Sequence, residues 1–195
     1  MRNEANAALW NSFKQGNWEA YTSLYNDYFS LLNNYGYKFT RNSNLIEDAI
    51  HDLFVRLWTS RHNLGDPVSV KNYLYKSLRN TLIRKIKMEE KYTDIDSEEY
   101  PSGFEVSYNN QADLAIEEKE FREKVKAVVN TLPPRQKEII YLRFYEGISY
   151  DEIADIMSIT TNSAYKLLYK ALENLQQTLG SSPLPGLLLF LNYFL

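Results

Sequence analysis

Residues 149–176 restrict the fold of this chain more than any other segment. Ser149 and Glu152 match a capping box, the side-chain pattern that marks the start of a helix. The turn Ser158-Ile159-Thr160 separates that short helix from a longer one. In the longer helix, apolar residues recur at spacings of four, three and four and therefore face inward: Ala164, Leu168, Ala171 and Leu175. The segment predicts a helix-turn-helix, with Ile159 filling the core between its two helices.

The rest of the chain also has the spacing of helices, with apolar residues three and four positions apart and no strand alternation. Helices are predicted at about residues 5–15, 17–36, 44–58, 69–88 and 113–132. We expect Asn44 and Ser69 to cap the third and fourth of these, with a loop, Thr59–Pro67, between them. Pro133-Pro134 suits the first turn of a further helix, which Glu146-Gly147 ends. The predicted fold class is all-α.

Charge divides the chain into three parts. Residues 1–87 carry a net charge of +5, residues 88–126 carry −7 and residues 127–195 carry −1. Helical periodicity also fails within the acidic part, which contains proline and glycine. We therefore interpret residues 89–112 as an acidic linker.

This linker would join two small helical domains, residues 5–88 and 113–179, the second containing the helix-turn-helix. Residues 180–195 then form an apolar C-terminal tail. An exposed apolar segment usually marks a contact. We favour packing of the tail against the protein itself or a second copy, with a partner or a membrane as the alternatives.

The composition excludes several classes of site. The chain has no Cys and only two His, and it lacks a Gly-rich phosphate loop and a nucleophile constellation. We therefore expect no metal, no cofactor, no small-molecule substrate and no enzymatic activity. The N-terminus has no apolar signal core, which predicts a cytoplasmic protein. Membrane contact is expected through a partner or, as a second choice, through the tail.

The outer face of the second helix of the helix-turn-helix carries polar and aromatic side chains. The leading residues of such a helix reach base edges in the major groove, where Asn pairs with adenine and Thr contacts the methyl group of thymine. The candidate DNA-binding residues are Thr160, Thr161, Asn162, Ser163, Tyr165, Lys166, Tyr169 and Lys170. The alternative is an ordinary helical pair with a polar outer face.

A second candidate surface lies on the predicted helix at residues 69–88. Each residue of a helix is rotated by about 100° around the helix axis from the one before it. Five side chains of this helix therefore fall within about 80° of one another around the axis, and further basic residues lie nearby. The candidate residues are Lys71, Tyr73, Lys76, Arg79, Asn80, Arg84 and Lys87. A basic face with Asn and Tyr suits phosphate contact and stacking on an unpaired base. The alternative is a surface that only aids solubility.

Three segments carry a resemblance to a known family. Residues 132–154, Leu-Pro-Pro-Arg-Gln-Lys-Glu-Ile-Ile-Tyr-Leu-Arg-Phe-Tyr-Glu-Gly-Ile-Ser-Tyr-Asp-Glu-Ile-Ala, closely resemble region four of extracytoplasmic-function (ECF) sigma factors of bacterial RNA polymerase. Glu47–Trp58 and Tyr73–Arg84 resemble region two of the same family. The chain departs from the family at Ser158, where Gly is usual, and at Leu167 and Leu172, where many members have Arg.

The resemblance implies a factor that directs core polymerase to specific promoters and starts transcription by −35 recognition and −10 opening. Its partners would be promoter DNA, the β′ clamp helices and β flap of core polymerase, and an anti-sigma factor. The implied polymerase-binding residues are Asp48, His51, Asp52 and Arg56, for which an ordinary solvated helix face is the alternative. In relatives, a loop before the second region-two segment captures a flipped −10 base, and Ser60–Pro67 corresponds to it here.

Two other functions compete with this interpretation. An ordinary helix-turn-helix regulator would bind duplex DNA tightly without polymerase, and the motifs of residues 45–87 would have no role in it. The near-neutral charge of residues 127–195 disfavours that regulator, because DNA affinity depends on phosphate neutralisation. An enzyme is the third possibility, and the sequence offers no constellation for one.

Overall fold

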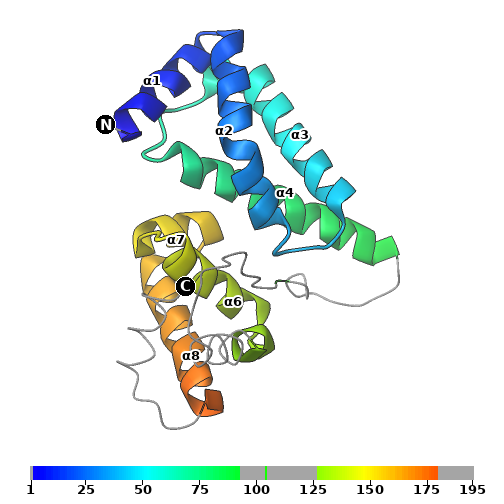
Figure 1. Ribbon diagram of the computed structural model, residues 1–195, viewed down its shortest axis with the longest axis vertical. Coiled ribbons are helices and arrows are strands. Elements are labelled where there is room, and N and C mark those ends of the chain that lie inside the picture. Colours follow the sequence, from blue (N-terminus) through cyan, green and yellow to red (C-terminus); the bar gives the residue numbers. More distant parts are fainter. Residues whose placement is uncertain (1, 93–103, 105–126, 180–195) are drawn as a thin grey trace, which may run out of the picture. The chain divides into compact units, whose positions relative to one another are not determined.

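The computed structural model describes residues 2–92, 104 and 127–179 of the chain (Figure 1). The chain divides into two compact units, Met1–Pro101 (unit 1) and Ser102–Leu195 (unit 2). The described residues form helices and turns with no strand among them, which confirms the predicted all-α fold class.

Unit 1 is a bundle of helices (Figure 1). Its elements are α1 (Arg2–Lys14), α2 (Trp18–Gly36), α3 (Ser43–Ser60), the short 3-10 helix η1 (Arg61–Asn63) and α4 (Val70–Tyr92). The helices α2, α3 and α4 each contact the other two, and α1 contacts α2, η1 and α4. The core between them is aromatic and aliphatic, with Trp10, Phe13, Tyr35, Phe54 and Tyr75 among its largest buried side chains.

Close approach at the end of α2 brings the three long helices together. A Cβ atom on Gly36 would lie 2.5 Å from Cγ2 of Ile46 on α3, so a larger residue at this position would force the helices apart. One residue earlier, the ring of Tyr35 stacks on that of Tyr75 on α4, with ring centroids 4.6 Å apart. The buried end of α2 therefore fixes the positions of α3 and α4.

The start of α3 differs from the prediction. Asn42, with extended backbone angles, caps the helix, and its side-chain oxygen accepts a hydrogen bond from the backbone N–H of Leu45 at 3.2 Å. Asn44 lies inside the first turn and does not cap it. Both residues suit the role by type, so the sequence pattern could not choose between them. Ser69 does cap α4, because its hydroxyl accepts from the backbone N–H of Asn72 at 3.3 Å.

Two boundaries in unit 1 also differ. The predicted loop Thr59–Pro67 begins with the last residues of α3 and the turn η1. At its other end, α4 continues to Tyr92, four residues into the segment predicted as linker. Three of these four residues are Glu or Lys, which are good helix formers, so a run of charged residues does not end the helix there.

Unit 2 contains the predicted helix-turn-helix. Residues 127–131 are helical and precede α6 (Pro134–Ile140), a π-helical turn η2 (Tyr141–Tyr145), α7 (Tyr150–Met157) and α8 (Thr161–Leu179). The start of α6 at Pro134 confirms the proline signal, but the single helix predicted as far as Glu146 changes to π-helical geometry at Tyr141. The backbone N–H of Glu146 donates to the carbonyl of Tyr141, five residues earlier, at 3.2 Å, and the Tyr141 hydroxyl donates to Glu146 Oε1 at 2.6 Å.

Apart from Phe104, the linker beyond residue 92 lies outside the described residues, as do most of the predicted helix 113–132 and the tail 180–195. Within the described part of the chain, no helix is both long and apolar enough to cross a membrane.

Candidate nucleic-acid interface

The turn between α7 and α8 is closed by backbone hydrogen bonds. Ser149 and Glu152 form both halves of the predicted capping box at the start of α7. At its end, Ser158 adopts a left-handed conformation with φ +55° and ψ 48°, and the backbone N–H of Ile159 donates to the carbonyl of Ala154 at 2.9 Å. This is the position where the family usually has Gly, which adopts such angles without a steric penalty. Ser158 therefore keeps the turn that glycine would favour.

Two threonine hydroxyl groups make hydrogen bonds at the start of α8. Thr160 Oγ1 accepts from the backbone N–H of Ser163 at 3.1 Å, and Thr161 Oγ1 donates to Asp151 Oδ1 on α7 at 2.8 Å. All four residues predicted to face inward are buried. Ile159 is only half-buried and does not fill the core as predicted. Apolar side chains of α7, including Ile153 and Met157, are buried instead.

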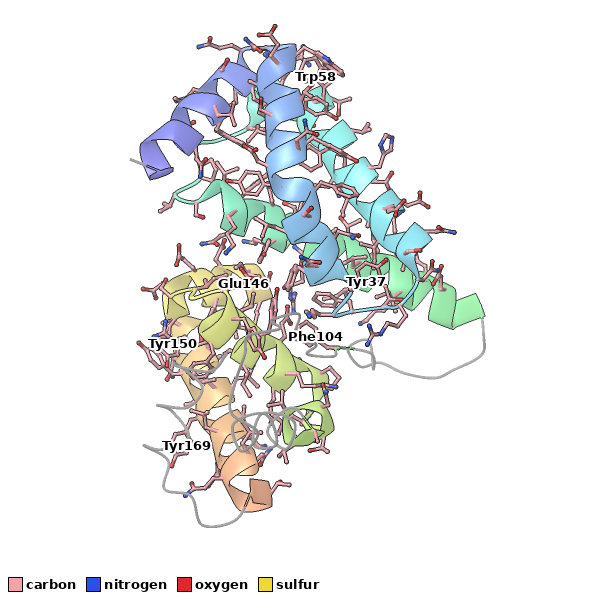
Figure 2. The ribbon with its side chains drawn as sticks, viewed as in Figure 1. Tyr37, Trp58, Phe104, Glu146, Tyr150 and Tyr169 are labelled. Carbon is pink, nitrogen blue, oxygen red and sulfur yellow. The ribbon has the colours of Figure 1, made fainter. Side chains whose placement is uncertain are left out.

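The outer face of α8 carries the predicted DNA-binding residues. Seven of them are exposed and Thr161 is half-exposed. Tyr165 and Tyr169 are 52% and 62% exposed, which is unusual for large aromatic rings. Figure 2 labels Tyr169 on α8 and Tyr150 at the start of α7. Tyr150 was not predicted to belong to this surface, but its ring stacks on that of Tyr165 with centroids 3.9 Å apart.

The two positions where many family members have arginine differ from each other. Leu172 is 6% exposed and belongs to the core of unit 2. Leu167 is half-buried at the edge of the outer face. The absence of arginine at residue 172 is therefore a matter of packing, whereas residue 167 borders the surface that would meet DNA.

The predicted basic face of α4 is present, with one exception. Asn80 and Arg84 are exposed, and the other candidates except Arg79 are half-exposed. Arg79 is 5% exposed, so its side chain is buried and offers little surface to DNA. The reason lies in its helical position: Arg79 follows Tyr75 by four residues and precedes Leu82 by three, and both of those are buried.

A cavity of about 390 Å³ lies between α3 and α4 at this basic face. Its lining comes from α3, α4 and the loop between them: Leu53, Arg56, Leu57, Ser60, Leu64, Tyr73, Ser77, Asn80, Thr81 and Arg84. Three of the predicted −10 residues, Tyr73, Asn80 and Arg84, thus share one cavity with two residues of the predicted base-capturing loop. Ser77 and Thr81 were missed, because small hydroxyl side chains on a helix have no distinctive sequence signal.

The four predicted polymerase-binding residues are all exposed on α3, but two of them also bond to α4. The guanidinium of Arg56 donates to Thr81 Oγ1 at 2.6 Å and so forms part of the cavity wall. The ammonium of Lys85 lies 2.8 Å from Asp52 Oδ2, and this hydrogen-bonded cation lowers the pKa of the Asp52 carboxyl. Asp48 and His51 lie on the same exposed face of α3.

The same part of α3 ends in an aromatic cluster. The ring of Trp58, labelled in Figure 2, lies edge-on to that of Trp18 with centroids 5.2 Å apart, and Tyr21 contacts both rings. Trp18 is 62% exposed, and Val55 on α3 is also exposed. The spacing of apolar residues predicts a helix at residues 17–36 but does not show that Trp18 is exposed, so sequence reasoning missed this apolar surface.

Two family models match the chain in the regions where these surfaces lie. The model described as sigma-70 region 2 matches residues 24–92, and the model described as sigma-70 region 4 matches residues 122–175. Together they cover more than half of the chain and contain both the cavity and the helix-turn-helix. The chain belongs to the sigma-70 family, as a sigma factor of the extracytoplasmic-function type.

Relatives of this sigma factor include two from Bacillus subtilis (strain 168). RNA polymerase sigma factor SigV is 27% identical over 139 residues, which span 70% of this chain and 77% of SigV. ECF RNA polymerase sigma factor SigM is 24% identical over 158 residues, which span 81% of this chain and 91% of SigM. The sigma factor therefore gives core RNA polymerase its promoter specificity, and its two matched regions bind polymerase and promoter DNA.

Two solved structures share the fold of this sigma factor. CnrH, in a complex with the cytosolic domain of CnrY, matches with a TM-score of 0.59 at 16% identity over 90% of this chain and 97% of CnrH. RpoE of Bartonella quintana, in a complex with the anti-sigma factor NepR, matches with a TM-score of 0.58 at 19% identity over 81% of this chain and 95% of RpoE.

Proposed function

We propose that the cavity between α3 and α4 receives an unpaired base of the −10 element, and that this capture opens the promoter. The observation that carries the proposal is the convergence of Tyr73, Asn80 and Arg84 with the loop residue Leu64 around one cavity. Its volume of about 390 Å³ lies within the range of small-molecule pockets, about 300–1,000 Å³.

Each of the three side chains suits one part of a nucleotide. A tyrosine ring stacks on a base, and an amide reads the hydrogen-bonding edge of a base. Arg84, exposed at the mouth of the cavity, carries the positive charge that a phosphate requires. Extruding a base costs a few kcal/mol, so a cavity that offers both stacking and hydrogen bonds can offset that cost.

We further propose that α8 binds the −35 element through the exposed residues at its start. Asn162 and the two exposed tyrosines offer groups that contact base edges, and Lys166 and Lys170 offer charges for phosphates. Because residues 127–195 carry a net charge of only −1, this helix would need polymerase to hold it on DNA. In this proposal residues 5–88 and 113–179 are the two working domains, joined by residues 89–112.

The polymerase-binding surface would be the exposed face of α3 together with the cluster of Trp18 and Trp58. Exposed aromatic rings with a polar rim are the usual composition of a protein interface, and Asp48 and His51 are exposed on the helix that carries Trp58. The likeness to RpoE, which was solved with an anti-sigma factor, supports a partner of that class for this chain. In this proposal the chain has no enzymatic activity of its own. It works in the cytoplasm, because it acts on polymerase and chromosomal DNA.

The deciding experiment combines the full chain with bacterial core polymerase and a promoter selected by the resulting holoenzyme. Strand opening is followed by permanganate reactivity of unpaired thymines, and polymerase binding by co-elution. We expect N80A combined with R84A to reduce opening at least tenfold and to leave polymerase binding unchanged. The matched control is E89A, which changes an exposed charged residue of the same helix outside the cavity.

Two outcomes would contradict the proposal. Opening that survives N80A with R84A would mean that the cavity does not capture the base. Tight binding of the isolated chain to duplex promoter DNA, with no gain from polymerase, would instead favour an ordinary helix-turn-helix regulator.

A further inference from the structure

We propose that α1 positions the base-capturing loop, with Trp10 and Lys14 as the positioning residues. This inference rests on the proposed capture of a −10 base in the cavity between α3 and α4. The helix α1 precedes residues 24–92, the part of the chain that matches the sigma-70 region 2 model.

Two contacts connect α1 to adjacent residues of the loop. The indole N–H of Trp10 donates to the backbone carbonyl of Gly65, with 3.1 Å between nitrogen and oxygen. One helical turn later, the ammonium of Lys14 pairs with the carboxylate of Asp66. Residues four apart lie on the same face of a helix, so a single face of α1 holds the loop at two consecutive residues.

The held residues adjoin the cavity. Leu64, which immediately precedes Gly65, belongs to its lining. The chain from Leu64 to Ser69 has no helix, and it runs beside α1 before α4 begins (Figure 1). Hydrogen bonding at Gly65 therefore limits how far Leu64 can move relative to the lining residues on α4, which include Asn80.

Trp10 also contacts a second wall of the cavity. Its ring lies edge-on to that of Tyr73, with centroids 5.5 Å apart and planes at 67°. Trp10 itself is 2% exposed, so the surrounding core fixes the position of its ring. The rigid side chain of Trp10 thus holds two parts of the cavity lining in position, the loop and the stacking ring of Tyr73.

Lys14 acts on charge as well as on position. Asp66 is largely exposed, and an isolated carboxylate beside the path of DNA would repel phosphate. Pairing with Lys14 neutralises it. The contribution of such an exposed pair to stability is small, so its removal should change the behaviour of the loop more than the stability of the fold.

The test uses the full chain in holoenzyme and compares two promoters, one with the preferred base at the captured position and one with another base there. The measured quantity is the ratio of their opening rates. W10F keeps an aromatic ring in the core and removes the N–H donor. We expect it to lower the ratio about fivefold, the factor that corresponds to one ordinary hydrogen bond. K14M should lower the ratio by a smaller factor, with an unchanged melting temperature.

Controls separate positioning from general damage. N11A changes an exposed residue on the same helix and should leave the ratio unchanged. A purely structural effect of W10F would slow opening on both promoters equally and preserve the ratio, and that result would overturn the inference. If W10F failed to fold, K14M would still test the inference, because K14M changes only a surface pair. An unchanged ratio for K14M would then count against the inference.

The same experiment distinguishes failure of this inference from failure of the proposed function. A ratio that N80A leaves unchanged would overturn base capture in the cavity, and the inference with it. A ratio that N80A lowers but W10F and K14M do not would leave base capture standing and overturn the role of α1 alone.

Discussion

The ring of Tyr165 stacks on the ring of Tyr150, with centroids 3.9 Å apart and planes 23° from parallel. Tyr150 begins α7 and Tyr165 lies on the outer face of α8, so the pair joins the two helices of the helix-turn-helix at their exposed side. The guanidinium of Arg143 also lies over the ring of Tyr150, 4.9 Å from its centroid. These contacts hold the half-exposed ring of Tyr150 in one orientation on the surface that is proposed to meet the −35 element.

Removing the ring of Tyr165 should weaken −35 recognition. We expect Y165A to reduce transcription from a selected promoter about tenfold, because both the contact with DNA and the stack on Tyr150 are lost. Y165F keeps the stack and should retain more than half of the activity. Run-off transcription with purified holoenzyme gives the measurement. Equal activity of Y165A and the original chain would mean that this part of α8 does not meet the promoter.

The left-handed turn at Ser158 predicts a stabilising substitution. Glycine adopts φ +55° without the steric penalty of a Cβ atom, so S158G should raise the free energy of unfolding by roughly 0.5–1 kcal/mol. S158A keeps the Cβ atom and is the matched control, for which we expect no gain. Urea denaturation followed by circular dichroism measures both. A loss of stability in S158G would show that the serine side chain stabilises the fold by more than its left-handed backbone destabilises it.

The pair of Asp52 and Lys85 predicts a dependence of stability on pH. The hydrogen bond from Lys85 lowers the pKa of Asp52 below 3.8 in the folded protein. A carboxyl with a lowered pKa stabilises the fold above its unfolded pKa, and that stability is lost as the pH falls through the folded pKa. K85M should therefore cost up to about 1 kcal/mol at pH 7, a small value because the pair is partly exposed, and less than that at pH 3.

Urea midpoints of K85M and the original chain at the two pH values give this comparison. D52N is the control, since it removes the same carboxylate and should abolish the same pH dependence. A difference between K85M and the original chain that is equally large at both pH values would attribute the effect to packing of the lysine side chain.

Exposed Trp18 predicts a contact with polymerase. W18A removes an aromatic ring that is 62% exposed, so we expect little change in stability and a loss of affinity for core polymerase of about tenfold. L31A, at another exposed apolar residue of the same helix, is the matched control and should bind normally. Competition with a labelled copy of the chain for core polymerase measures the affinity. Normal binding by W18A would exclude the cluster of Trp18 and Trp58 from the interface.

Much of this fold could be predicted from the sequence because helical periodicity reports which face of each helix is buried. Leu168 and Leu175 face inward as their spacing predicts, and the capping box at Ser149 begins α7. The pattern was weaker where two residues of one type compete, as at Asn42 and Asn44. It was also weaker where charge was interpreted as the absence of structure, as in the last turn of α4.

The candidate site was harder to predict because it depends on contacts between distant residues. Arg79 looked like one more basic residue near a basic face, yet it lies in the same helical row as Tyr75 and is buried. The link between Trp10 and Gly65 spans 55 positions, and no local pattern contains it. A sequence pattern assigns residues to a helix face, whereas a cavity requires knowing which faces meet.

The positions of Leu167 and Leu172, where many sigma factors of this type have arginine, give opposite predictions. Leu172 is 6% exposed in the core of unit 2, so L172R would bury an unpaired charge and should destabilise the chain by about 3–5 kcal/mol. Leu167 is half-buried at the edge of the outer face of α8, where an arginine can reach solvent with its charged end. L167R should therefore fold and add one phosphate contact, which steepens the dependence of promoter binding on salt by about one ion. Thermal unfolding and salt titrations of holoenzyme on promoter DNA measure the two effects. If L167R left the salt dependence unchanged, this edge of α8 would face away from DNA. Tyr165 and Tyr169 would then have to contact the promoter from the side of the helix away from Leu167.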